Sequence, residues 1–103
     1  MSKPERDQAF FDMADRFIAL ANSMAEETDA GRVSASLLFA AARFNTFLVA
    51  RSASNGEELS GFQGKATAYY EAEYSKMLLE HFADYVEHFD TYLGKPPGGH
   101  TLN

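Results

Sequence analysis

The sequence predicts an all-α fold, and three observations lead to this class. Val and Ile are few, whereas the helix-favouring residues Ala, Leu and Glu are common. No segment alternates β-branched with polar residues, as a half-buried strand would. Apolar residues instead recur at helical spacing in segments joined by short connections, which favours antiparallel neighbours. We therefore expect an antiparallel bundle of three main helices, with residues 3–93 as a single domain and residues 94–103 as a flexible, disordered tail rich in Pro and Gly.

The first helix is expected to begin near Pro4, because proline suits the first turn of a helix. It should end around Glu27, ahead of a short polar connector. Apolar residues between these ends recur at spacings of three and four, which is the pattern of a helix with one buried side. The stripe consists of Phe10, Ala14, Phe17, Ile18, Ala21, Met24 and Ala25.

The second helix contains the most apolar stretch of the chain, residues 33–50, which reads VSASLLFAAARFNTFLVA. It is apolar nearly all the way round and is interrupted by Arg43 and Asn45. A helix without a wet face is a buried helix, so we expect this one to form the centre of the core. Asp29 is the expected N-cap. Thr28 and Ser34 are alternative caps, and the helix should end near Arg51 or Ser52.

The third helical region is long and extends from about Glu57 to Leu93 after a short turn. Gly61 and Gly64 lie early in it, and each costs ~1 kcal/mol relative to Ala in a helix. We therefore expect either a short first helix or a kink near these glycines, followed by a long helix from about Lys65. Its buried side should carry Ala66, Tyr69, Tyr70, Tyr74, Met77, Leu78, Phe82, Tyr85, Phe89 and Tyr92.

The length of this last helix predicts self-association. A helix from Lys65 to Leu93 spans roughly 40 Å, about two turns more than either expected partner. Its overhang would leave aromatic surface exposed in a monomer. The expected contacts of a homodimer are Tyr74, Tyr85, Phe89 and Tyr92.

Charge and composition exclude several functions. The formal net charge is −6 over 103 residues, and residues 53–103 hold three basic against eight acidic side chains. This acidity disfavours binding to nucleic acids and to anionic lipid. The absence of cysteine excludes disulfides, thiolate nucleophiles and cysteine-type zinc sites. The first ten residues do not resemble a signal peptide, and Arg43 in the most apolar stretch opposes membrane insertion, so we expect a cytoplasmic protein.

Three strings of the sequence are similar to a known family. They are ADRFIALAN at residues 14–22, VSASLLFAAARFNTF at residues 33–47 and YYEAEYSKMLLEHFADYVEHFD at residues 69–90. They resemble a family of small, mostly proteobacterial proteins known as the domain of unknown function number 3144. The resemblance extends from about Phe10 to Leu93. It implies a compact helical protein that is bacterial and cytosolic, and it implies no activity and no site residue.

One polar group is a candidate ligand site. Asp15 and Asn22 share a stripe on the first helix, and Arg43 lies on an edge of the second. If these edges face each other, Asp15 could form a bidentate pair with Arg43, with Asn22 or Asn45 completing the hydrogen bonds. Such a group is either an anion or carboxylate pocket or a structural ion pair at a helix seam. We favour the structural interpretation.

A second polar group has the residue types of a metal site. His81, Asp84 and His88 are spaced by three and four residues and so share one side of a helix. Imidazole and carboxylate are ligands for zinc or iron. This spacing is common on helices, however, and the E-x-x-H pair of di-iron bundles is absent. We favour a solvated helix surface over a metal site.

The sequence contains no recognisable catalytic motif. The nucleophile pattern G-x-S-x-G, the P-loop and the dinucleotide pattern G-x-G-x-x-G are all absent, and no cofactor is implied. We therefore predict a non-enzymatic protein–protein interaction module that pairs with itself or with another protein. The alternative is a small-molecule or metal-binding helical protein that uses Arg43 with Asp15, or His81 with Asp84 and His88.

Overall fold

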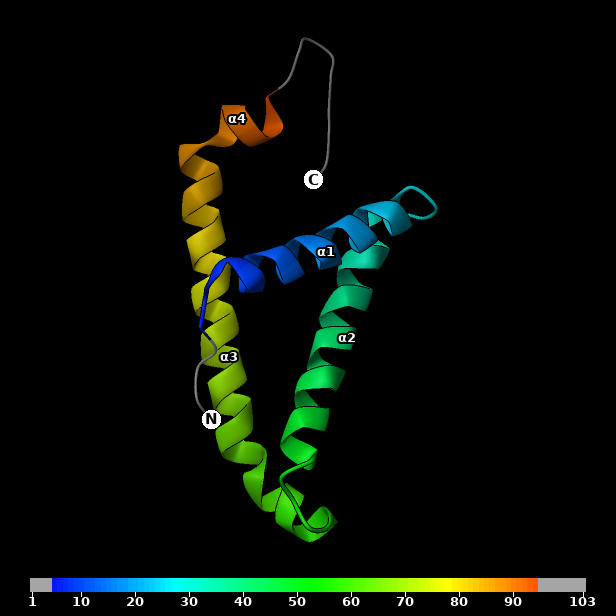
Figure 1. The fold of residues 1–103 in the computed structure, drawn as a ribbon, viewed down its shortest axis with the longest axis vertical. Coiled ribbons are helices and arrows are strands. Elements are labelled where there is room, and N and C mark those ends of the chain that lie inside the picture. Colours follow the sequence, from blue (N-terminus) through cyan, green and yellow to red (C-terminus); the bar gives the residue numbers. More distant parts are fainter. Residues whose placement is uncertain (1–4, 95–103) are drawn as a thin grey trace. The chain divides into compact units, whose positions relative to one another are not determined.

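The computed structural model describes residues 5–94 of the chain and is built from helices (Figure 1). They are α1 (Gln8–Ala25), α2 (Ala30–Ala50), α3 (Gly56–Glu87) and α4 (Phe89–Leu93). The described range contains no strand, so the predicted all-α class with three main helices is confirmed. Most of the predicted tail, residues 95–103, lies outside the described residues.

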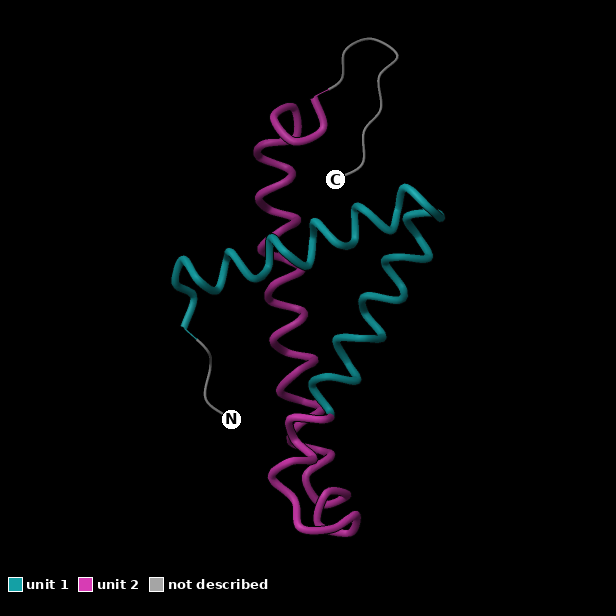
Figure 2. Tube along the Cα trace, turned by 45° about the vertical axis from the view of Figure 1, so that its right-hand side comes forward, with its two compact units in different colours: residues 1–46 teal, residues 47–103 magenta. Residues whose placement is uncertain are grey.

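Two compact units divide the chain, residues 1–46 and residues 47–103 (Figure 2). The boundary lies inside α2, after Thr46. The last residues of α2 are therefore grouped with α3 and α4, whereas the greater part of α2 is grouped with α1.

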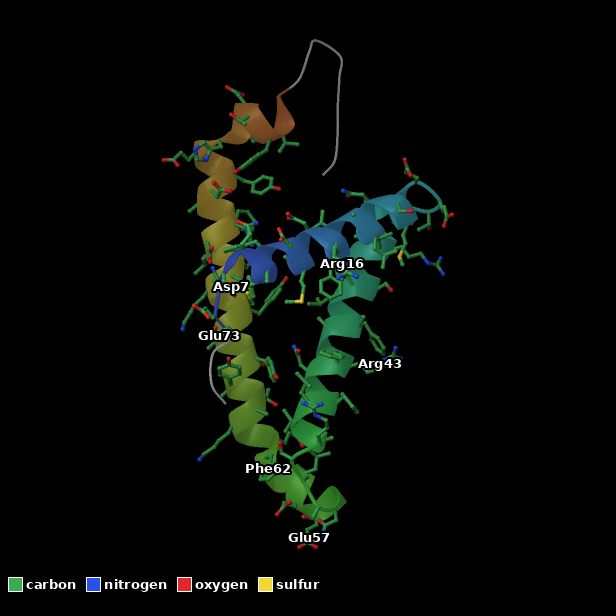
Figure 3. The ribbon with its side chains drawn as sticks, in the orientation of Figure 1. Asp7, Arg16, Arg43, Glu57, Phe62 and Glu73 are labelled. Atoms are coloured by element: carbon green, nitrogen blue, oxygen red, sulfur yellow. The ribbon has the colours of Figure 1, made fainter. Side chains whose placement is uncertain are left out.

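The start of α1 is fixed by a side-chain cap. Asp7 is extended, and its Oδ1 accepts a hydrogen bond from the backbone N–H of Phe10 at 3.0 Å. A cap of this kind satisfies an N–H that has no partner within the helix. Figure 3 shows Asp7 at this end of α1. The predicted start near Pro4 is wrong, because the helix begins after its capping residue, at Gln8.

A short connector joins α1 to α2 within the first unit. The backbone N–H groups of Glu27 and Thr28 donate to the Met24 carbonyl at 2.9 and 3.1 Å, and α1 ends at Ala25, two residues before its predicted end. Asp29 Oδ1 then accepts a hydrogen bond from the Arg32 N–H at 2.8 Å. Asp29 thus caps α2, as the sequence predicts.

The start of α3 carries two hydrogen bonds that run in opposite directions. Asn55 Oδ1 accepts from the N–H of Glu58 at 2.8 Å, and Glu58 Oε1 accepts from the N–H of Ser54 at 2.7 Å. This exchange resembles a capping box. From this start α3 continues through Gly61 and Gly64 to Glu87, with a ribbon that curves over its first turns (Figure 1). The alternative of a separate first helix is wrong, because about 1 kcal/mol per glycine does not break a helix that is capped and hydrogen-bonded on both sides.

The predicted third helix is interrupted near its C-terminal end. His88 has φ −113° and ψ 31°, outside the helical region, and separates α3 from α4. Its N–H still donates to the Asp84 carbonyl at 2.9 Å, and its carbonyl accepts from Tyr92 N–H at 3.0 Å. The chain changes direction between α3 and α4 (Figure 1). One helix extending to Leu93 is therefore a wrong prediction, and the third helix ends at Glu87.

Burial along α2 differs most from the sequence prediction. Val33, at 8% exposure, is the one buried hydrophobic residue among the described residues. Phe39 and Phe44 are 70% and 61% exposed. The expectation of a buried central helix is therefore wrong for the single chain. The physical reason is that α1 does not approach α2 closely within the described residues of the first unit, so the greater part of α2 has no covering neighbour there.

Candidate functional site

A polar cluster occupies the junction of α3 and α4. Asp84 lies in the last turn of α3, and both of its carboxylate oxygens are used. Oδ1 lies 3.0 Å from His88 Nδ1, and Oδ2 accepts a hydrogen bond from the Tyr92 hydroxyl at 2.9 Å. His88 Nε2 lies 3.4 Å from a carboxylate oxygen of Glu87. The Asp84 carboxylate therefore links α3 to α4 through His88, at the break between the helices, and through Tyr92 in α4.

The cluster changes the acidity of one tyrosine. The hydrogen bond to Asp84 raises the pKa of Tyr92 above 10.0, because the bond is lost when the phenol ionises. Desolvation and the negative charge of the Asp84 carboxylate raise this pKa further. The Tyr92 ring also packs on Tyr85, with ring centroids 4.6 Å apart. These contacts give the cluster a structural role at the joint between the two helices.

The predicted metal group is only partly brought together. Asp84 and His88 meet, but the third member of their cluster is Tyr92 rather than His81. Over residues 5–94, no three His, Asp or Glu side chains are grouped so that they could hold a metal ion. The structure thus offers no geometry on which metal chemistry at His81 would be built.

The predicted polar group on the first two helices is not assembled in this structure. Asp15, Asn22 and Arg43 are exposed, and Asn45 is half-exposed. Within the described part of the chain, no hydrogen bond or ion pair joins Asp15 to Arg43. Arg43 projects from the side of α2 (Figure 3). A ligand site at these four residues stays a prediction.

The predicted interface tyrosines have different surroundings. Tyr74 is 48% exposed and Phe89 is 49% exposed. Tyr85 and Tyr92 instead stack on each other at the joint of α3 and α4. Two members of the predicted contact set, Tyr85 and Tyr92, thus pack on each other within the chain.

A continuous apolar face lies beside these tyrosines on the C-terminal half of α3. We call it the α3 face and define it as Leu78, Leu79, Phe82 and Val86, which are 43%, 68%, 63% and 76% exposed. Spacings of three and four place these residues on one side of the helix. Leu79 and Val86 are not among the residues that the sequence pattern predicts for the buried side of this helix. The signal that would have found them is the i, i+3, i+7 spacing of Leu79, Phe82 and Val86.

Large apolar side chains are exposed on the other two long helices as well. Phe17 on α1 is 62% exposed and Phe47 on α2 is 53% exposed, in addition to Phe39 and Phe44. By its length and composition alone, α2 is also apolar enough to cross a membrane, with a mean hydropathy of 1.5 over its most apolar window. Large exposed apolar patches mark contact regions on proteins, so each of these helices is a candidate to carry one.

These features define a class, a small all-helical protein whose apolar side chains are largely uncovered in the single chain. Residues 10–86 match the family described as Protein of unknown function (DUF3144), and the chain belongs to this family. The match confirms the resemblance drawn from the three sequence strings. Comparisons with curated proteins and with solved structures found no match.

Proposed function

We propose that this protein is a non-enzymatic interaction module that functions as a homodimer. The observation that carries the proposal is the exposure of large apolar side chains on α1, α2 and α3, with Val33 alone buried among the described hydrophobic residues. Burying one large apolar side chain is worth roughly 1.5–3 kcal/mol. Isolated helices are marginal in water, so these helices need a covering surface to be stable.

A second copy is the simplest covering surface. Soluble homo-oligomers most often form with two-fold symmetry, in which the same patch is hidden on both chains. The net charge of −6 makes a nucleic acid or an anionic membrane a poor partner. The cysteine-free sequence is compatible with the reducing cytoplasm, where we place the module.

Sedimentation equilibrium of the full chain tests this function. We expect a mass near twice 11.4 kDa at micromolar concentration, and loss of helicity by circular dichroism as dilution separates the chains. The mass should not respond to zinc or to a chelator. Moderate salt should strengthen association, because α3 carries seven acidic and two basic residues.

A helical protein that stays monomeric at every concentration and salt would refute the homodimer. A monomer that gains stability on adding zinc would favour the metal-binding alternative instead. Both results are read from the same unmodified chain.

A further inference from the structure

We propose that the second copy docks on the α3 face, so that two α3 helices pack antiparallel through Leu78, Leu79, Phe82 and Val86. This inference rests on the proposed homodimer and names its surface. It replaces the predicted tyrosine contact, because Tyr85 and Tyr92 already pack on each other at the joint of α3 and α4.

The exposed area reaches the minimum for a specific pair. The α3 face and Tyr74, one turn before Leu78 on α3, are between 43% and 76% exposed. Taking about 180 Å² for a fully exposed large side chain, they present at most about 540 Å² per chain. Two copies would bury at most about 1,100 Å² of this surface, close to the ~1,000 Å² that a specific interface needs, before the polar rim is added.

Charge selects the antiparallel direction. Lys76 and Glu87 are eleven residues apart, about three helical turns, so they lie on the same flank of α3. Their side chains are 65% and 75% exposed. An antiparallel pair centred between His81 and Phe82 brings Lys76 of each copy beside Glu87 of the other. A parallel two-fold pair would instead place the two copies of Glu87 on opposite flanks, each far from Lys76 of the other copy, so this attraction would be absent.

The antiparallel arrangement predicts which residues lie at the centre of the pair, and this prediction can be tested. In the antiparallel arrangement Phe82 of both copies lies next to the two-fold axis. Val86 of one copy is then offset from Val86 of the other by about 13 Å along the helix, from the rise of 1.5 Å per residue. A parallel pair would bring the two copies of every face residue close together.

Disulfide trapping distinguishes these arrangements, because the chain has no cysteine of its own. A disulfide needs Cα atoms closer than about 7 Å. We expect Phe82→Cys to form a covalent dimer under mild oxidation. Val86→Cys should not, and Lys76→Cys on the flank serves as an exposed control. Efficient linking of Val86→Cys would overturn the antiparallel pair.

Charge variants test the face without a new covalent bond. We expect Val86→Lys to raise the dimer dissociation constant at least tenfold. Gln63→Lys adds the same charge to an exposed polar position of α3, away from the face, and should change the constant less than twofold. Lys76→Glu should weaken the dimer severalfold, and adding Glu87→Lys to that variant should restore it.

Each remaining outcome has one meaning. A wild-type dimer that Val86→Lys leaves intact overturns this surface and leaves the proposed function standing. A wild-type monomer overturns both. A Val86→Lys variant that loses stability with no change in mass shows that the chain covers the face itself, which also overturns the proposal.

Discussion

Two glycines inside α3 offer a quantitative test of the helix. Gly61 and Gly64 are helical, and a Cβ added at either would have no neighbour within 4 Å among the described residues. Neither glycine is therefore needed for a close approach of another described part of the chain. Glycine disfavours a helix because it loses more backbone freedom on folding than alanine does. Replacing each by alanine should stabilise the protein.

The expected gain is about 1 kcal/mol for each substitution and ~2 kcal/mol for both, since nothing in the structure strains the new methyl groups. For a domain of this size, 1 kcal/mol shifts Tm by about 4–8 °C. The assay is urea and thermal unfolding followed by circular dichroism, at one fixed protein concentration because dimerisation would otherwise shift Tm. The urea slope m should not change.

A third helical glycine provides the control. A Cβ at Gly31 would lie 3.2 Å from Asp29 Oδ1, the oxygen that caps α2. Gly31→Ala should therefore gain less than the α3 variants or lose stability. If Gly61→Ala or Gly64→Ala destabilises the protein, the α3 backbone at these positions is approached closely by another surface, and the reasoning from the single chain fails.

Three local features carry further expectations. Asn55→Ala should cost about 1 kcal/mol by removing the cap on Glu58 N–H, whereas Asn55→Asp should retain it; urea unfolding measures both. In an ultraviolet titration the Tyr92 phenol should ionise above pH 10.0, and this ionisation step should be absent in Tyr92→Phe. Since the pKa of Tyr92 is raised on folding, its contribution to stability is complete below pH 10.0 and is lost as the pH rises through the raised value. Gly94→Ala should loosen the end of α4, seen as faster amide exchange, because its Cβ would collide with the Asp90 carbonyl.

The cap of α2 could be predicted from the sequence, whereas the Asp7 cap of α1 and the break at His88 could not. Asp29 was identified as a cap because an Asp side chain before an apolar periodic segment satisfies a free N–H at short range. The residues around His88 have no Pro or Gly, so periodicity predicts a continuous helix there. The break coincides with contacts among Asp84, His88 and Tyr92, which depend on rotamers that no sequence pattern specifies.

The candidate surface was predictable only in part, because periodicity identifies what must be covered and not what covers it. The spacing of apolar residues predicts an apolar side of α3 that includes Leu78 and Phe82. They were expected to be buried within one chain, yet they are 43% and 63% exposed. The choice between an intramolecular and an intermolecular partner depends on how many apolar faces one chain can cover, which is a property of the whole fold.

The helix α2 is apolar on two sides, so it needs more than one covering surface. Val33 and Phe44 share one side of the helix, eleven residues apart, and Leu38 and Val49 share another at the same spacing. The two sides are separated by about 140°, from the helical repeat of 3.6 residues per turn. One packed neighbour covers a stripe of roughly 100°. Because α2 is apolar on both sides, a single neighbouring helix leaves one side in water, so a stable assembly has to place α2 between two surfaces. The contact between two α3 helices does not itself cover either side of α2. It doubles the number of helices in the assembly, and these helices are available to cover both sides.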